Sequence, residues 1–189
     1  MVNKGEMTRE LLGAGLKSLM LQKSFDKITI KMITDEAGVI RPTFYNHFKD
    51  KYELLEYIFH EEIGKKIQEI LQDGMERESM KLLFLLLERE KEFYQKAFLV
   101  TGQNGFEEIM AEGFFRAFMD YLEGHETLVD EDISFLNKEM VARYYATALT
   151  TVIKLWLCQG EERISAEQMA KACYYLMEHS IADLIQMED

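Results

Sequence analysis

Apolar residues recur at the three- and four-residue spacing of helices along almost the whole chain, and no stretch shows the strict alternation of a half-buried strand. With one proline in 189 residues, little interrupts these helices. The pattern predicts an all-α protein of about nine helices. The predicted elements are a helix over residues 8–23, two short helices beginning near Ile30 and Pro42, a long helix over 51–71, and five more over 77–88, 89–101, 104–123, 131–158 and 165–187.

Two short helices in the N-terminal third meet at a tight turn. Thr29 can cap the first of them, and Gly38 follows it where a left-handed residue closes a helix. Pro42 suits the first turn of the second helix, whose Phe44 and Phe48 share a face and are expected to be buried. The polar and aromatic side chains around them then face outward. This is the arrangement of a helix-turn-helix that presents a recognition helix to the DNA major groove.

This stretch resembles the N-terminal DNA-binding domain of the TetR family of bacterial regulators. The residues that match the family pattern are Phe25, Ile28, Thr29, Ile33, Ala37, Gly38, Val39, Thr43, Tyr45, His47, Phe48, Lys51, Leu54 and Leu55. The chain departs from the pattern at Ile40, where a serine is usual, so a hydroxyl cap and a phosphate contact are missing. Pro42 replaces a glycine and Thr34 an alanine. Gly13 and Gly15 interrupt the first helix, each costing roughly 1 kcal/mol relative to alanine.

The resemblance implies two units, a DNA-binding domain of residues 1–50 and a linking, ligand-binding and dimerisation domain of residues 51–189. The expected partner of the first unit is a double-stranded DNA operator. The residues expected at the DNA are Arg41, Thr43, Tyr45, Asn46 and His47 in the groove, with Thr29, Lys31 and Lys51 on the phosphate backbone. The alternative is a purely structural helix-turn-helix, in which Tyr45 and His47 are core residues.

The charge distribution agrees with this division. The net charge is −12, yet residues 1–51 carry nine Lys and Arg against six Asp and Glu, a balance of +3, and the remainder carries −15. Positive charge therefore gathers at the end expected to meet DNA, while the acidic remainder is repelled by it. An ordinary solvated surface accounts for most of the carboxylates in that remainder.

Targeting and redox features favour the cytoplasm. The first ten residues are polar, unlike a signal peptide, and the apolar run at residues 82–87 is too short to cross a membrane. Cys158 and Cys173 fall in apolar helical stretches, as expected of two buried thiols in a reducing compartment. A redox sensor is the alternative use of these cysteines.

The last two predicted helices carry apolar faces wider than one neighbour within a monomer needs. TetR-family proteins dimerise through their last two helices, so the resemblance implies a homodimer here. The residues expected in that interface are Tyr144, Ala148, Val152, Leu155, Met169, Cys173, Leu176, Met177, Ile181 and Leu184. Such a dimer places two recognition helices on a palindrome. An internal core is the alternative use of these faces.

Aromatic residues in the same half predict a pocket for an unknown small-molecule effector. The predicted lining is Tyr94, Phe98, Phe114, Phe118, Tyr145 and Trp156, and ordinary core packing is the alternative. The nearby Glu107, Glu108 and Glu112 indicate a cationic ligand, with an apolar one as the other option. Residues 75–187 are loosely similar to the C-terminal domain of a TetR subgroup that includes the regulator of dihydroxyacetone kinase operons. Because that regulator works with a protein co-activator, such a co-activator is an additional candidate partner.

Enzyme classes find no support in the sequence. It holds no glycine-rich phosphate loop, no G-x-S-x-G and no C-x-x-C motif, and no histidine follows a glutamate by three positions, as a helical di-metal site requires. No metal or cofactor is expected. The sequence indicates a ligand-responsive transcriptional repressor that binds a palindromic operator as a homodimer. The alternatives are an activator or interaction protein that needs a co-activator on its C-terminal helices, and a small-molecule carrier without DNA affinity.

Overall fold

A computed structural model describes residues 4–102, 104–125, 136–159 and 164–184. The elements in these ranges are α1 (Lys4–Gln22), η1 (Phe25–Lys27), α2 (Ile30–Glu36), α3 (Arg41–Tyr45), α4 (Lys51–Phe59), η2 (His60–Gly64), α5 (Lys65–Gln72), α6 (Glu76–Arg89), α7 (Lys91–Ala97), α8 (Phe106–Glu123), α9 (Lys138–Cys158), α10 (Ala166–Glu178) and η3 (Ile181–Leu184). No strand occurs among these described residues. The all-α prediction is confirmed, and the described chain has nine α-helical segments if α4, η2 and α5 are counted as one continuous path.

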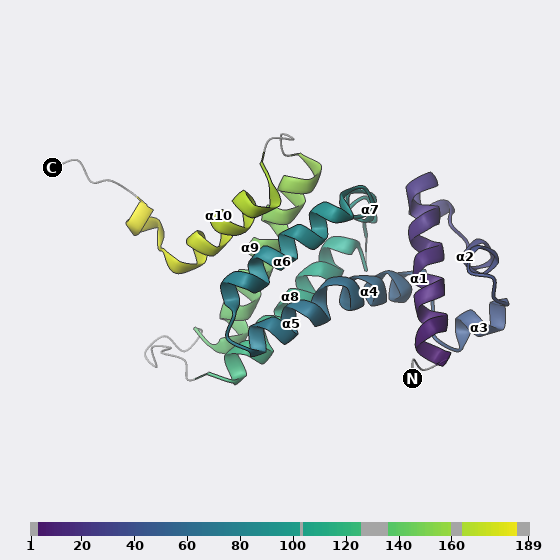
Figure 1. The fold of residues 1–189 in the computed structure, drawn as a ribbon, viewed down its shortest axis with the longest axis horizontal. Helices are drawn as coiled ribbons and strands as arrows, with labels where there is room; N and C mark the ends of the chain where they lie inside the picture. The colour runs from purple at the N-terminus through teal and green to yellow at the C-terminus, as the bar shows by residue number, and fades with distance from the viewer. Residues whose placement is uncertain (1–3, 103, 126–135, 160–163, 185–189) are drawn as a thin grey trace.

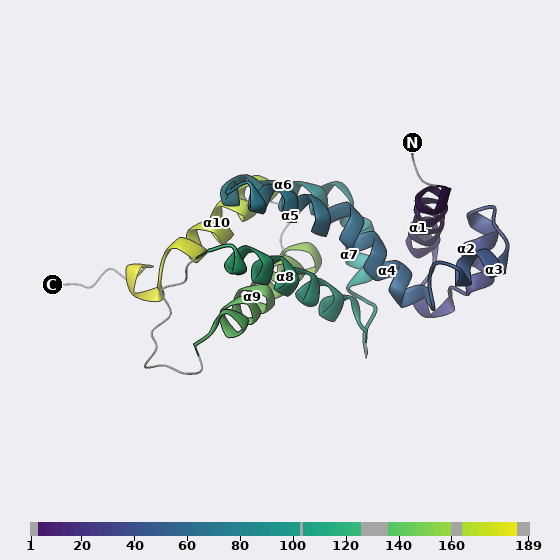
Figure 2. The same ribbon diagram turned by 90° about the horizontal axis from the view of Figure 1, so that it is seen from below.

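The molecule is elongated, with α1, α2 and α3 together at one end (Figure 1). Helix α4 leads from this end to the other helices, and α10 and η3 lie at the opposite end (Figures 1 and 2). In the larger part α8 packs along α9, α10 packs along α6, and α5 contacts both α6 and α8. None of the described helices is both long and apolar enough to cross a membrane.

Helix α1 runs unbroken through the two glycines that were expected to interrupt it. Its Leu12 and Leu16 are fully buried, as their spacing predicts. A Cβ at Gly15 would lie 3.3 Å from the carbonyl oxygen of Ile33 and 3.4 Å from the backbone nitrogen of Ala37. Glycine is used here because it lets the backbone of α2 approach α1 closely.

The predicted long helix over residues 51–71 is one helical path that contains a π-turn. Residues His60–Gly64 form this turn between α4 and α5. Leu55 before the turn and Ile63 within it are both fully buried, so the apolar face stays on the core through the change of register. Single π-turns inside α-helices frequently mark functional sites.

The last predicted helix, residues 165–187, is too long. Helix α10 begins with a capping box formed by Ser165 and Gln168 but ends at Glu178, because His179 is extended with φ −127° and ψ 139°. The backbone nitrogen and Oγ of Ser180 then both donate to Asp183 at 2.7 Å, which starts the short helix η3. The last three residues of the prediction lie outside the described residues.

Two other predicted helices also differ from those observed. The segment predicted over residues 89–101 contains only the two-turn helix α7, followed by a turn that leads to Gly102 with φ +94°. Helix α9 begins at Lys138 because the side chain of Asn137 caps it, accepting a bond from the backbone nitrogen of Met140 at 2.8 Å. The first five residues of the predicted helix over 131–158 lie outside the described residues.

Helices α4 and α8 cross where Gly113 faces Phe59, and this contact predicts a stability change. A Cβ at residue 113 would lie 2.6 Å from the ring of the buried Phe59. Gly113→Ala is therefore expected to lower the free energy of unfolding by about 1–3 kcal/mol through overpacking. Gly64→Ala is the matched control, because its Cβ would come no closer than 3.6 Å to His60. That variant should be neutral or more stable by up to about 1 kcal/mol in urea unfolding, and equal effects of both changes would contradict the close α4–α8 approach.

Candidate nucleic-acid interface and effector cavity

The helix-turn-helix is built from local contacts that the sequence anticipated. Thr29 Oγ1 accepts a bond from the backbone nitrogen of Met32 at 3.3 Å and so caps α2. Gly38 closes this helix with φ +68°. Phe44 and Phe48 are both buried, which fixes the face that α3 turns toward the core. Because Phe44 and Phe48 pack into the core, the opposite face of α3 points outward.

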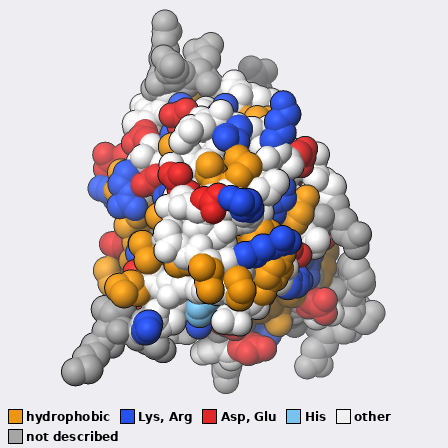
Figure 3. All heavy atoms as spheres, turned by 90° about the vertical axis from the view of Figure 1, so that its right-hand side faces the viewer, with side chains coloured by type: hydrophobic (Ala, Val, Ile, Leu, Met, Phe, Trp, Pro, Cys, Tyr) orange, Lys and Arg blue, Asp and Glu red, His pale blue; other side chains and the backbone are white. Residues whose placement is uncertain are grey.

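The outward face of α3 carries polar and basic side chains. Arg41, Tyr45 and Asn46 are exposed, while Thr43 and His47 are half-buried. With 49% of its surface exposed, Tyr45 is not a core residue, so the purely structural alternative loses its main support. Arg41 Nη2 donates to the Tyr45 hydroxyl at 3.1 Å, and the guanidinium lies 5.6 Å from the ring centre. Figure 3, which looks onto this end, shows Lys and Arg side chains spread across it, with hydrophobic side chains and also Asp and Glu side chains between them.

Two of the residues expected on phosphates are free to make that contact. The ammonium of Lys31 lies 2.5 Å from the carboxylate of Asp35 in a pair of well-exposed side chains. Such a surface pair contributes little, so a phosphate can replace the carboxylate. Thr29 uses its hydroxyl oxygen as an acceptor in the cap, which leaves its proton available to a phosphate.

Lys51, expected on the phosphate backbone, makes contacts within the protein in this structure. Its ammonium donates to the carbonyl oxygens of Phe25 at 2.7 Å, Ile28 at 3.0 Å and Asp26 at 3.4 Å, and lies 4.4 Å from the centre of the Phe25 ring. Burial lowers the pKa of this ammonium, against the opposing effect of Asp26. Because all three N–H donors have intramolecular partners, the geometry makes Lys51 a clamp between the start of α4 and the η1 turn.

The start of α4 is capped by Asp50 and resembles a capping box with one shift. Asp50 Oδ1 accepts bonds from the backbone nitrogens of Tyr52 and Glu53, both at 2.9 Å. The Glu53 carboxylate reaches back to the nitrogen of Lys49 at 2.6 Å rather than to that of Asp50. The reciprocal bond of a capping box is thus displaced by one residue.

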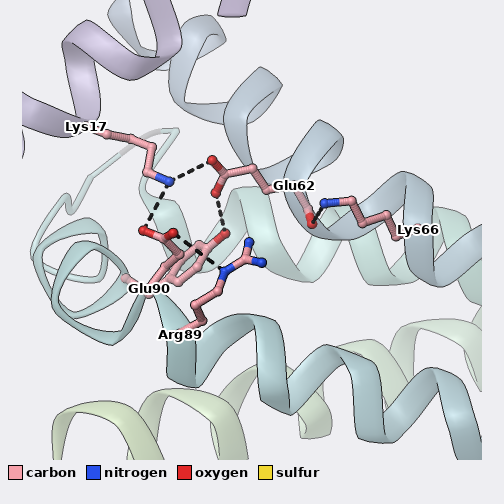
Figure 4. Close-up of polar contacts among 6 residues, drawn as sticks. Lys17, Glu62, Lys66, Arg89 and Glu90 are labelled. Atoms are coloured by element: carbon pink, nitrogen blue, oxygen red, sulfur yellow. Dashed lines mark hydrogen bonds and ion pairs between the residues drawn. The ribbon is translucent and has the colours of Figure 1, made fainter.

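A polar network joins the N-terminal helices to the rest of the molecule (Figure 4). The Lys17 ammonium of α1 lies 2.7 Å from a Glu62 oxygen in the π-turn and 3.2 Å from a Glu90 oxygen between α6 and α7. The Lys17 side chain is 19% exposed and its ammonium also lies 5.1 Å from the centre of the Phe93 ring. One cation therefore holds three parts of the chain together.

Tyr94, predicted to line the ligand pocket, belongs to this network instead. Its hydroxyl donates to Glu62 at 3.3 Å. Burial, together with the neighbouring Glu62 carboxylate, raises the pKa of Tyr94 well above its ordinary value, so the hydroxyl remains a donor. Arg89 faces Glu90 at 3.7 Å and completes the set of charges (Figure 4).

A cavity of about 450 Å³ lies between α5, α6, α8, α9 and α10. Three of the predicted aromatic residues line it, namely Phe114, Phe118 and Tyr145. The other three do not. Phe98 packs edge-on against Phe106, Trp156 packs on Phe84 and donates to the carbonyl of Ile164 at 2.9 Å, and Tyr94 lies in the network above.

The cavity wall carries acidic but no basic side chains among the described residues. Tyr121 donates its hydroxyl to Glu76 at 2.6 Å. This bond lowers the pKa of Glu76 and, together with burial, raises the pKa of Tyr121 to about 12, so the carboxylate is ionised and the phenol neutral at neutral pH. Glu178, the other charged lining residue, lies 3.6 Å from Arg77.

The acidic residues that first indicated a cationic ligand lie elsewhere. Glu107 pairs with Lys154 at 2.6 Å, Glu112 pairs with Arg143 at 2.7 Å, and Glu108 accepts from the backbone nitrogen of Asn104 at 3.1 Å. None of these three carboxylates lines the cavity. The acidic residues that line the cavity are instead Glu76 and Glu178.

The α9–α10 face, defined by Tyr144, Ala148, Leu155, Leu176, Ile181 and Leu184, is exposed apolar surface. Its most exposed members are Ile181 at 78%, Tyr144 at 65% and Leu176 at 54%. Five of the six, all but Leu155, line a groove of about 590 Å³ between the two helices. The four other residues expected in the interface, Val152, Met169, Cys173 and Met177, pack on the monomer core, and all of them except Met169 also line this groove.

The two cysteines differ in their surroundings. Cys173 is buried as expected, and burial raises its pKa to about 11, which makes its thiol unreactive at neutral pH. Cys158 is exposed, so the prediction that it is buried was wrong.

Sequence reasoning missed the Lys17 network and the Glu76–Tyr121 pair. Both join residues at least 45 positions apart, and nothing in the local pattern of charges marks such partners. It also missed that Ile40, noted only as a departure from the family pattern, is 70% exposed.

Comparison with protein families gives a match for each half of the chain. Residues 14–58 match the model described as bacterial regulatory proteins, tetR family. Residues 76–179 match the model described as transcriptional regulator C-terminal region. The second match alone spans more than half of the chain, and together they cover the helix-turn-helix and every helix that lines the cavity except α5.

Individual relatives are more distant. The chain is 25% identical over 159 residues to the HTH-type dhaKLM operon transcriptional activator DhaS of Lactococcus lactis. The matched region covers 84% of each chain. It is 34% identical over 89 residues to the uncharacterized HTH-type transcriptional regulator YwcC of Bacillus subtilis. That match covers 44% of this chain and 40% of YwcC. Among solved structures, the dihydroxyacetone kinase operon activator DhaS has a TM-score of 0.62 at 24% identity, covering 90% of this chain and 94% of that one. NalD of Pseudomonas aeruginosa, a repressor of the MexAB-OprM multidrug efflux pump, has a TM-score of 0.57 at 18% identity, covering 93% and 96%. These structural likenesses show the fold.

The clamp formed by Lys51 predicts a loss of stability when its ammonium is removed. Lys51→Met is expected to lower the free energy of unfolding by about 1–3 kcal/mol, because carbonyl groups at η1 lose their charged donor. Lys49→Met, two residues earlier and exposed, should change it by no more than about 0.5 kcal/mol. Urea unfolding of both variants makes the comparison. Equal stabilities, with weaker DNA binding only for Lys51→Met, would return Lys51 to the phosphate role first expected.

Proposed function

Because the chain belongs to the TetR family of bacterial regulatory proteins, we propose that this helix-turn-helix transcriptional regulator is a ligand-responsive repressor that binds a palindromic operator as a homodimer. The observation that carries the proposal is the outward face of α3, where exposed Arg41, Tyr45 and Asn46 stand opposite a buried Phe44. Residues 1–50 form the reading unit, and residues 51–189 form the regulatory and dimerisation unit.

The contacts with DNA are of two kinds: some side chains read the base edges, and others bind phosphates and position the protein. Arg41 gives up its hydrogen bond to Tyr45 and reaches base edges or phosphates. The side-chain amide of Asn46 can pair with adenine. Thr43 and His47, half-buried beside them, complete the surface toward the groove. Thr29 and Lys31 at the start of α2 hold the phosphate backbone, which fixes the register without reading sequence.

A second copy of this chain covers the α9–α10 face. That face is apolar and extends over α9, α10 and η3, and its Tyr144, Leu176 and Ile181 are each more than half exposed in the described monomer. A two-fold axis through it produces a four-helix interface and separates two identical reading units.

The cavity between α5, α6, α8, α9 and α10 holds the effector. Its aromatic wall and the ionised Glu76, with no Lys or Arg among the described lining residues, suit a cationic or neutral apolar molecule and disfavour an anion. Helix α5 lines the cavity and continues through the π-turn into α4. A ligand that shifts α5 therefore acts on Glu62, which Lys17 ties to the reading unit.

Activation through a protein co-activator is the alternative function. One observation favours activation over repression, namely that the DhaS relative is named an operon transcriptional activator. The two functions differ in whether the purified chain alone recognises an operator.

Enrichment of random duplex DNA on the purified protein at physiological salt tests the proposal. A recovered palindrome is the expected result, since two identical units read two identical half-sites. The absence of any enriched sequence would contradict an unaided repressor and would favour the alternative that needs a co-activator.

Substitutions at the DNA face should then separate reading from positioning. On the enriched duplex and on single-base variants of it, Arg41→Ala and Asn46→Ala are expected to relax preference at particular positions. Lys31→Ala should instead weaken binding to all duplexes alike and reduce the slope of log affinity against log salt by about one unit per contact. Fluorescence anisotropy at several salt concentrations measures both quantities. A uniform loss for all three variants would contradict the division.

The charge of the cavity predicts a preference between two probes of nearly equal shape. Tetraphenylphosphonium, a cation, should bind about tenfold more tightly than tetraphenylborate, an anion, in calorimetric titration. Glu76→Gln should reduce this preference, because it keeps an acceptor for Tyr121 but removes the charge. Glu107→Gln is the control, since that carboxylate pairs with Lys154 outside the cavity. Tighter binding of the anion, or equal effects of the two substitutions, would contradict the assignment.

A further inference from the structure

Ile40 is the N-cap residue of α3, and its side chain makes no capping bond. Thr29 caps α2 and Asp50 caps α4, each through an oxygen that accepts backbone N–H bonds. Ile40 occupies the same position before α3 and makes no such bond. Serine, threonine, aspartate and asparagine stabilise this position, whereas isoleucine is among the poorest residues there.

The Ile40 side chain does not contribute to the core either. It is 70% exposed and is absent from the buried cluster and from the side chains packed against it. Its neighbour Val39 packs on that cluster and so supplies the apolar contact of the turn. Neither helix capping nor core packing accounts for isoleucine at this position.

The location of Ile40 relates it to DNA. The first residues of a recognition helix are those that reach base edges in the major groove. Ile40 directly precedes Arg41, on the end of the molecule where basic and hydrophobic side chains lie together (Figure 3). Among the groups that base pairs present in the major groove, the thymine C5-methyl is the apolar one. A β-branched side chain has few rotamers, so it loses little entropy when it makes this contact.

We propose that Ile40 reads a thymine methyl group in each half-site of the operator. This inference rests on the proposed function, since it assigns a specificity residue to the same DNA surface. It gives a reason for an apolar residue at the cap position of α3. A contact with the sugar–phosphate backbone does not select isoleucine, because that backbone offers charge and hydrogen-bond acceptors.

Replacement of thymine by uracil tests the contact, because uracil lacks only the C5-methyl and keeps the same hydrogen-bonding edge. The probe is the duplex recovered from the random pool, with one thymine at a time changed to uracil. At one position of each half-site the change should weaken binding by wild-type protein about fourfold, the value of one buried methyl group. Changes at the two symmetric positions together should weaken it by about sixteenfold.

The Ile40→Ser variant supplies the decisive comparison. It restores a side-chain cap, so its melting temperature should equal or exceed that of the wild type, and any loss of affinity is then not a loss of folding. Its affinity should no longer distinguish thymine from uracil at that position. Leu99→Ala removes another strongly exposed apolar side chain, 74% exposed and far from α3 in the chain, and should leave the discrimination unchanged.

Two results would overturn the inference while leaving the proposed function intact. One is specific DNA binding in which no thymine methyl matters, and the other is unchanged uracil discrimination in Ile40→Ser. Failure of wild-type protein to bind any duplex would reject the proposed function, and this inference with it.

Discussion

The ion pairs of Lys17 with Glu62 and Glu90 are the constraint on which the arrangement of the molecule depends. The ammonium comes from α1, one carboxylate from the π-turn and the other from the junction of α6 and α7. All three groups are partly shielded from water, so loss of the cation would leave the Glu62 carboxylate with the neutral Tyr94 hydroxyl and Glu90 with Arg89 at 3.7 Å. The N-terminal helices thus keep a fixed orientation on the larger part through a contact that is sensitive to small shifts of either side.

The continuity of α4, the π-turn and α5 gives this contact its functional meaning. Helix α5 lines the cavity, Glu62 lies in the π-turn, and α4 begins at the Lys51 clamp beside the helix-turn-helix. One helical path, with the π-turn in its middle, therefore runs from the wall of the cavity to the helix-turn-helix. Under the proposed function, coupling along this path is reciprocal, so an operator that selects one orientation of the N-terminal helices also changes the affinity for an effector.

The N-terminal unit was predictable from sequence because its determinants are local. Thr29, Gly38 and Phe44 act within a few residues of their own positions, through a cap, a left-handed turn and a helix face. Three of the six aromatic residues predicted to line a cavity do line it, and local spacing explains which ones. Phe114 and Phe118 share a face of one helix and do line it, whereas Trp156 turns to Phe84 and Ile164 through tertiary contacts that no spacing reveals. Lys51 illustrates the limit most clearly, since a lysine in a first helical turn suits a phosphate, yet the η1 carbonyls compete for its ammonium and occupy it.

Native mass spectrometry of the protein with its enriched duplex tests the two-fold reader most directly. Two chains bound to one palindromic duplex, and two chains in the absence of DNA, are the expected masses. A single chain on the full duplex, or a monomer at every protein concentration, would contradict both the role of the α9–α10 face and the symmetric reading of DNA.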